Sequence, residues 1–100
     1  GRDENKFETM GLTPVKSELV HAPYVKEFPV NLICRLYKTL ELGLHTQFIG
    51  EILEVLADDD TLDHRNMPLM EKVNPFIYDS AQRTYYSVGS RLDKAFVKVK

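Results

Sequence analysis

The most regular alternation of hydrophobic and polar residues in this chain runs through residues 30–41, VNLICRLYKTLE. One side of a period-two pattern is apolar, and its members are Val30, Leu32, Cys34, Leu36 and Leu40. The other side is mostly polar and includes Ile33, while Lys38 interrupts the apolar side. Such alternation predicts a half-buried β-strand. Some helical spacing is also present, but the preceding Pro29 and the β-branched and aromatic residues favour the strand.

A second long strand is predicted over residues 45–58, HTQFIGEILEVLAD, directly after a turn that contains Gly43. Two such runs joined by a short glycine turn predict an antiparallel hairpin. Gly50, in the middle of the second run, predicts either a β-bulge or a close approach of two backbones.

The remaining segments predict short elements. Residues 2–10 are consistent with a short helix that Asp3 caps and Gly11 ends. Residues 12–29 contain three prolines and predict an extended connector, with short strands at residues 19–21 and 24–25.

After the long hairpin, residues 61–66 predict a polar loop and residues 68–73 one or two helical turns that begin at a proline. Short strands are expected at residues 76–78 and 83–88, and scattered apolar positions at residues 92–99 close the chain. The expected fold is therefore mainly β, with two or three helical turns, in one domain over residues 1–100.

Composition and charge narrow the possible classes of function. The chain has 100 residues, of which 43% are hydrophobic and 28% charged, with a net charge of −2. This composition argues against disorder, and no apolar run approaches the roughly 20 residues of a membrane span. Because no basic block is present, we expect no nucleic-acid partner, and because no apolar run is long enough, we expect no membrane partner.

Cys34 is the only cysteine, so it can form no internal disulfide and no zinc site that needs two thiolates. A reducing, cytoplasmic compartment is expected. Cys34 itself lies between leucines on the apolar side of its strand, which predicts a small core residue rather than a nucleophile.

No complete catalytic motif is present, and each candidate has a simpler alternative. Lys6 and Arg83 are cations next to aromatic residues that would suit a phosphate, or are ordinary surface charges. His45 opens a strand, where it would contact a ligand or solvent. If residues 83–88 form a strand, Tyr85 and Tyr86 point to opposite faces, one of them into the core.

Residues 58–60 are three consecutive aspartates, and Asp63 follows closely. These carboxylates would suit a divalent cation, but the glycine and glutamate of an EF-hand loop are missing. A solvated turn is the simpler interpretation.

The order of several short sequence segments resembles that in the C-terminal half of the flavin reductase-like family, in particular its flavoredoxin branch. They are NKFETMGLTP (5–14), HAPYVKEFPVNLICRLYKTLELG (21–43), HTQFIGEI (45–52), NPFIYDSAQRTYYSVG (74–89) and DKAF (93–96). The resemblance implies part of an antiparallel split β-barrel that binds FMN and usually forms a homodimer.

Two departures from the family pattern affect what the resemblance implies. Family members are longer, and the N-terminal half with the first barrel strands and much of the FMN site is not among these residues. A homodimer, or a complementary N-terminal segment, is therefore expected. Many relatives have Gly-Asp-His before the second long strand, whereas this chain has Gly43-Leu44-His45 and so lacks the carboxylate.

The resemblance implies three cofactor-binding residues. Lys6 would lie near the FMN phosphate, His45 beside the flavin or the nicotinamide, and Tyr85 along the cofactor pocket. Gly50 would be small because barrel strands pack closely around it. No catalytic residue of the protein's own and no metal ligand are implied.

The implied function is that of an FMN-binding flavoprotein, either an NAD(P)H-dependent flavin reductase or a flavoredoxin-type electron-transfer protein. NAD(P)H is the expected electron donor, and the flavin carries the redox chemistry. The alternatives are a flavin carrier without catalysis and a structural or interaction module that binds no flavin. A small metal-binding domain ranks last.

Overall fold

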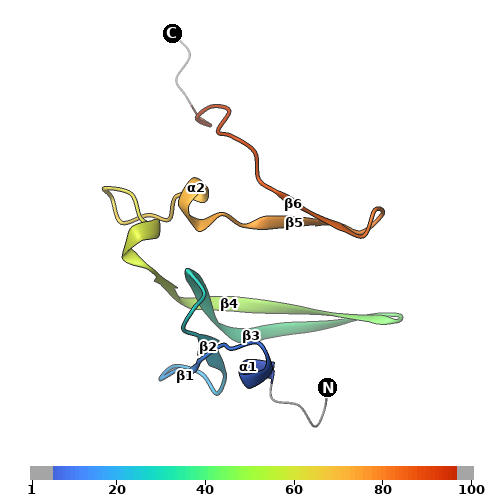
Figure 1. Cartoon of the computed structure of the whole chain (residues 1–100). Helices are drawn as coiled ribbons and strands as arrows, with labels where there is room; N and C mark the ends of the chain where they lie inside the picture. Colours follow the sequence, from blue (N-terminus) through green and yellow to red (C-terminus); the bar gives the residue numbers. More distant parts are fainter. Residues whose placement is uncertain (1–5, 97–100) are drawn as a thin grey trace.

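The computed structural model describes residues 6–96 of the chain (Figure 1). Short elements surround two long strands, in the order α1 (Lys6–Thr9), β1 (Pro14–Lys16), β2 (Pro23–Val25), β3 (Val30–Leu42), β4 (His45–Ala57), η1 (Asp59–Thr61), α2 (Met70–Val73), β5 (Phe76–Asp79) and β6 (Thr84–Ser87). The expectation of a mainly β fold with short helical turns is confirmed. Neither short α-helix in this part of the chain has the length or the apolar character needed to cross a membrane.

Three separate antiparallel hairpins make up the sheet structure: β1–β2, β3–β4 and β5–β6. The long hairpin turns at Gly43, whose φ of +70° is a left-handed conformation that glycine adopts without steric cost. In Figure 1 the turns of β3–β4 and β5–β6 lie toward the same side of the molecule, opposite the connection formed by residues 58–75.

One predicted strand is wrong. Residues 19–21 form a loop, and the strand that pairs with β2 is instead β1. The reason is local, because the Oγ atom of buried Ser17 accepts hydrogen bonds from the N–H groups of Leu19 (3.1 Å) and Val20 (3.4 Å). These bonds bend the chain just after β1 and leave the following backbone unavailable for pairing.

Two β-bulges determine which face each side chain of the β3–β4 ribbon occupies. The register shifts between Ile33 and Cys34, and again between Leu36 and Lys38. Each bulge adds one residue to one strand. The later side chains of that strand therefore point to the opposite face from the one that strict alternation predicts. Leu40 was expected on the side of Leu36, but the second bulge moves it to the opposite face. Lys38 likewise leaves that side, so it no longer interrupts the apolar row.

One face of the ribbon is covered at its base. Ile33, expected among polar neighbours, is only 5% exposed and is the most buried hydrophobic residue described. Strand β2 packs on β3 there, and the Asn31 side chain bonds to both backbone groups of Val25, at 3.2 and 3.0 Å. Asn31 thereby replaces a missing strand partner and holds β2 against the ribbon.

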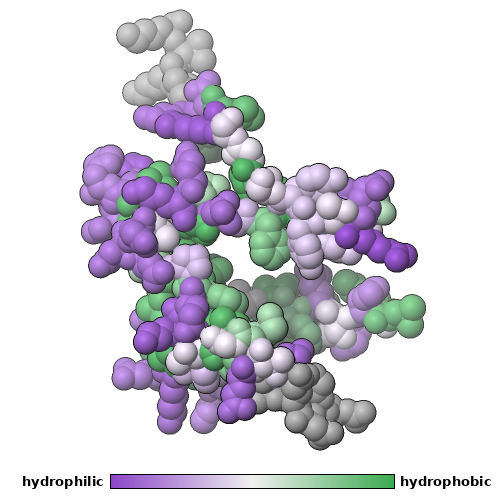
Figure 2. Space-filling view, in the orientation of Figure 1, coloured by the Kyte–Doolittle hydropathy of each residue, from purple (hydrophilic) through white to green (hydrophobic). Residues whose placement is uncertain are grey.

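The opposite face, which we call the uncovered face, carries the row of apolar residues that the alternation predicted as core. Its large members are between 49% and 68% exposed; they are Leu32, Leu36, Phe48, Ile52 and Val55. Cys34 lies in the same row and is exposed, so its prediction as a buried core residue is wrong for the described chain. In Figure 2, hydrophobic surface borders a hollow between the ribbon and the β5–β6 hairpin.

The whole chain is more open than a compact domain of its size. Its accessible surface is 9577 Å², whereas a compact protein of this mass exposes about 5,800 Å². The radius of gyration is 17.3 Å, against about 13 Å for a compact 100-residue domain. The chain therefore exposes about 3,800 Å² more surface than a compact protein of this mass.

Gly50 provides a test of the close approach within the ribbon. A Cβ atom at this position would lie 3.2 Å from Cys34 Cβ, on the paired strand, whereas one at Gly89 would meet nothing within 4 Å. We expect Gly50→Val to lower the free energy of unfolding of the full-length protein by about 1–3 kcal/mol, because the added methyl groups force the strands apart. Gly89→Val is the matched control in denaturant unfolding, and equal effects of the two changes would contradict a specific close contact at Gly50.

Candidate functional site

Lys6 is the first residue of α1, and its side chain is exposed. The helix lasts one turn, because the chain reverses at Gly11 (φ +69°) and the Leu12 N–H bonds to the Phe7 carbonyl at 2.7 Å. The predicted end of the helix at Gly11 is thus confirmed, while the predicted cap Asp3 lies outside the described residues. The arrangement leaves the Lys6 ammonium accessible to an anionic group.

His45 opens β4 at the tip of the long ribbon, directly opposite Leu42. It is exposed, and it lies about 40 Å from the base of the ribbon, given the rise per residue of a strand. The neighbouring pair is Glu41 and Thr46, and the Thr46 hydroxyl donates to Glu41 Oε2 at 3.1 Å. Adjacent pairs project to opposite faces, so Glu41 does not take the place of the carboxylate that Leu44 lacks.

Tyr85 lies in β6 within a cluster of three aromatic rings. Its ring meets Phe76 edge-on with centroids 5.0 Å apart, and it is tilted against Tyr78 at 5.1 Å. Both contacts cross the hairpin, in which Tyr78 is the direct partner of Tyr85. Tyr86 pairs with Ile77 on the other face, as the alternation predicts, but both tyrosines are more than half exposed, so neither is the core residue expected.

Sequence reasoning did not assign Phe76 and Tyr78 to the site. The signal that could have found them is the register of the short hairpin, because a turn centred on residues 80–83 places residue 78 opposite residue 85. Paired aromatic residues of this kind present a broad apolar surface with two hydroxyl groups.

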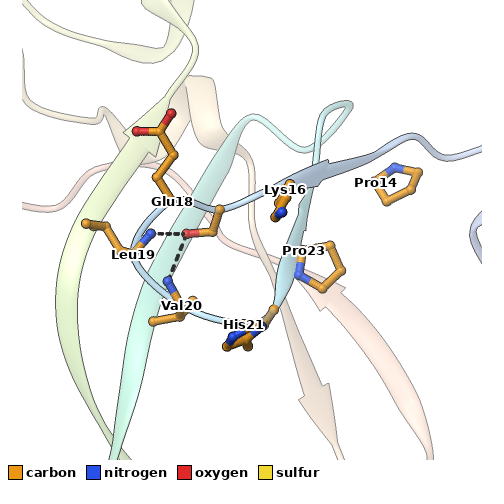
Figure 3. Close-up of a pocket in the computed structure, with 9 residues that line it drawn as sticks. Pro14, Lys16, Glu18, Leu19, Val20, His21 and Pro23 are labelled. Atoms are coloured by element: carbon orange, nitrogen blue, oxygen red, sulfur yellow. Dashed lines mark hydrogen bonds between the residues drawn. The ribbon is translucent and has the colours of Figure 1, made fainter.

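A pocket opens in the loop between β1 and β2 (Figure 3). Lys16 and His21 lie beside it, and the Glu18 carboxylate points away from both of them. The Ser17 hydroxyl oxygen is already engaged by the two loop N–H groups described above. None of the three predicted cofactor residues lines this pocket.

The structure therefore brings none of Lys6, His45 and Tyr85 together. Within the described chain, the main packing contacts join β1 with β2, β2 with β3, β3 with β4, α2 with η1, and β5 with β6. No contact in that set joins α1, the tip of β4 and β6. In chemical terms Lys6 offers a cation that suits a phosphate, and Tyr85 offers aromatic surface that suits a planar ring.

The aspartate-rich segment has a structural role. Asp63 Oδ1 accepts hydrogen bonds from the N–H groups of Met67 (3.0 Å) and Arg65 (2.8 Å). These bonds lower the pKa of the Asp63 carboxyl, the bond from Met67 contributing most. Among residues 6–96, no group of three or more His, Cys, Asp or Glu side chains could hold a metal ion.

The chain is similar to known proteins over almost its whole length. Residues 1–87 match the flavin reductase like domain family. The structure of flavoredoxin from Desulfovibrio vulgaris (Miyazaki F) is 47% identical and superimposes with a TM-score of 0.88, over 96% of this chain and 51% of that one. Flavoredoxin from Methanosarcina acetivorans is 26% identical with a TM-score of 0.81, over 94% and 50%.

A third similar solved structure contains a split barrel. It is a Shewanella frigidimarina protein described as a flavin reductase with a split barrel domain; it is 26% identical, with a TM-score of 0.75, over 97% of this chain and 50% of that one. The chain belongs to the flavin reductase-like family, and its hairpins form part of a split barrel. It spans about half the length of these solved relatives.

The hydrogen bonds at Asp63 predict how this segment responds to acid. Because the folded state lowers the carboxyl pKa, the stabilisation is present above the ordinary aspartate pKa and is lost as the pH falls through the folded value. An NMR titration should show Asp63 protonating below the usual aspartate range. Asp63→Asn should reduce the loss of stability below about pH 4, with Asp59→Asn as control. An ordinary or raised pKa at Asp63 would contradict these bonds.

Proposed function

We propose that this chain is part of an FMN-binding flavoprotein that takes electrons from NAD(P)H, as a flavin reductase or as a flavoredoxin-type electron-transfer protein. The observation that carries the proposal is the match to a flavoredoxin over 96% of the chain at 47% identity. The activity of the whole protein is proposed with it, since the match covers only 51% of that flavoredoxin.

Each of the three candidate residues has a separate role in this proposal. Bound FMN supplies the hydride and electron chemistry, so the protein needs no nucleophile of its own. Lys6 binds the phosphate as a point charge. Tyr85, supported by Phe76 and Tyr78, lines the ring of the cofactor, and His45 contacts the flavin or the nicotinamide.

Polypeptide outside these 100 residues completes the site. The uncovered face supports this step, because a row of large apolar side chains does not remain in water in a stable domain. A segment like the other half of the solved relatives would cover that face, and a homodimer is expected. The lone Cys34, which forms no disulfide, fits a cytoplasmic location.

Two alternatives differ from this proposal in what they bind or catalyse. A flavin carrier would bind FMN but not oxidise NAD(P)H. A structural or interaction module would bind no flavin, and its purified full-length protein would be colourless. An absorption spectrum therefore separates the module from the other two, and an NAD(P)H oxidation assay separates the carrier from the reductase.

The proposed role of Lys6 predicts a selective defect. Lys6→Ala in the full-length protein should weaken FMN binding by about 10–100-fold, the worth of a hydrogen bond to a charged group. Riboflavin has no phosphate, so its affinity should change little. Both constants are measured by the quenching of flavin fluorescence.

Lys72→Ala, which removes an exposed lysine from α2, is the matched control and should leave both affinities unchanged. If Lys6→Ala weakens riboflavin binding as strongly as FMN binding, Lys6 does not bind the phosphate. If the full-length wild-type protein binds neither ligand, the proposed function itself is wrong.

A further inference from the structure

The loop that joins β1 to β2 forms a pocket that plays no part in the proposed cofactor site. Residues 17–22 close this hairpin from Lys16 to its direct partner Pro23. The pocket inside the loop has a volume of about 1050 Å³, whereas pockets that hold small molecules have volumes of about 300–1,000 Å³. The space is therefore sufficient for a molecule of nucleotide size.

Two side chains at this pocket are suited to bind an anion. Lys16 and His21 both line it, and both are exposed. A lysine ammonium binds phosphate as a point charge. The imidazole of His21 donates an N–H whether it is neutral or protonated. The two side chains together favour a phosphate group as the ligand.

The acidic side chains of this hairpin do not occupy those two donors. The Glu18 carboxylate points away from both Lys16 and His21 (Figure 3). Glu27 lies at the other end of the hairpin, where its Oε1 atom accepts a hydrogen bond from the Thr13 N–H at 2.6 Å. Among the described residues, no ion pair joins Lys16 or His21 to a carboxylate. Both donors therefore remain available to a bound anion.

Ser17 fixes the course of the loop around the pocket. Its buried Oγ atom accepts hydrogen bonds from the N–H groups of Leu19 and Val20, which hold these two residues in the pocket wall. Pro14 and Pro23 add further apolar surface to that wall. Small-molecule sites combine apolar walls with a few polar groups, and a pre-formed loop loses less entropy on binding. The body that carries the phosphate would rest on this apolar surface.

We propose that the β1–β2 loop binds a phosphate ester of nucleotide size, with the phosphate on Lys16 and His21. None of Lys6, His45 and Tyr85 lines this pocket, so the site is separate from the proposed FMN site and does not depend on it. The phosphate ester has two sources to distinguish: the dinucleotide NAD(P)H, or a separate nucleotide.

Calorimetric titration of the full-length protein, saturated with FMN, measures the binding of adenosine 5′-monophosphate. We expect Lys16→Ala to weaken this binding by about 10–100-fold, the worth of one hydrogen bond to a charged group. Lys26 is exposed at the other end of the hairpin, beside Thr13, so Lys26→Ala is the matched control and should bind like the wild type. Adenosine, which has no phosphate, should bind weakly to all three proteins.

NMR locates the bound phosphate and kinetics identifies its source. On addition of adenosine 5′-monophosphate, the ring protons of His21 should shift and those of the exposed His64 should not. If the pocket holds a phosphate of the electron donor, Lys16→Ala also raises the KM for NADPH. If it holds a separate nucleotide, that KM stays unchanged while binding of the monophosphate is lost. Both results support the proposed site.

The inference is overturned if the wild-type protein does not bind adenosine 5′-monophosphate, if adenosine binds equally well, or if Lys26→Ala and Lys16→Ala have equal effects. Unshifted ring protons of His21 would also overturn it. Loss of monophosphate binding in Lys6→Ala would mean that the probe occupies the FMN site instead. Monophosphate binding by a full-length protein that takes up no flavin would contradict the proposed function alone, and flavin binding without monophosphate binding would contradict this inference alone.

Discussion

The order of this fold depends on what packs against one face of the two-stranded β3–β4 ribbon. Backbone pairing between β3 and β4 satisfies the hydrogen-bonding groups on the facing edges of the two 13-residue strands but buries few side chains. An isolated two-stranded hairpin is marginal in water, so its order must come from packing on its faces. Here β2 and Asn31 cover one face at the base and bury Ile33. The row on the opposite face, which includes the paired residues Leu32 and Val55, has no such cover within the described chain. This explains the open shape of the molecule.

The residue patterns predicted which strands and turns form better than they predicted how exposed the side chains on them are. The long strand expected from the alternation at residues 30–41, the glycine turn at Gly43 and the short strands expected at residues 76–78 and 83–88 are all found in the structure. Gly50 indicated a bulge or a close approach, and the second bulge lies beside its pair with Leu36, but the pattern did not show that the extra residue is in β3 and it missed the first bulge. That omission put Leu40 on the wrong face. Cys34 was predicted to be buried because alternation reports which side is apolar, but not whether anything lies against it.

At the candidate site, too, contacts within one hairpin are easier to predict than the arrangement of segments that lie far apart in the sequence. Resemblance to the family suggested Lys6, His45 and Tyr85, and the structure places the rings of Phe76 and Tyr78 beside Tyr85. It does not make the three residues converge. The proposed cofactor site therefore needs polypeptide outside these 100 residues to bring the three residues together.

Amide hydrogen exchange along β3 and β4 tests the central claim most directly. It would be measured on these 100 residues alone, at a concentration where they are monomeric, and on the full-length protein. The account predicts rapid exchange at Cys34, Leu36 and Ile52 in the isolated chain and strong protection of the same amides in the full-length protein. Equal, strong protection of these amides in an isolated monomer would show that the ribbon needs no cover on its apolar face, and would contradict the account.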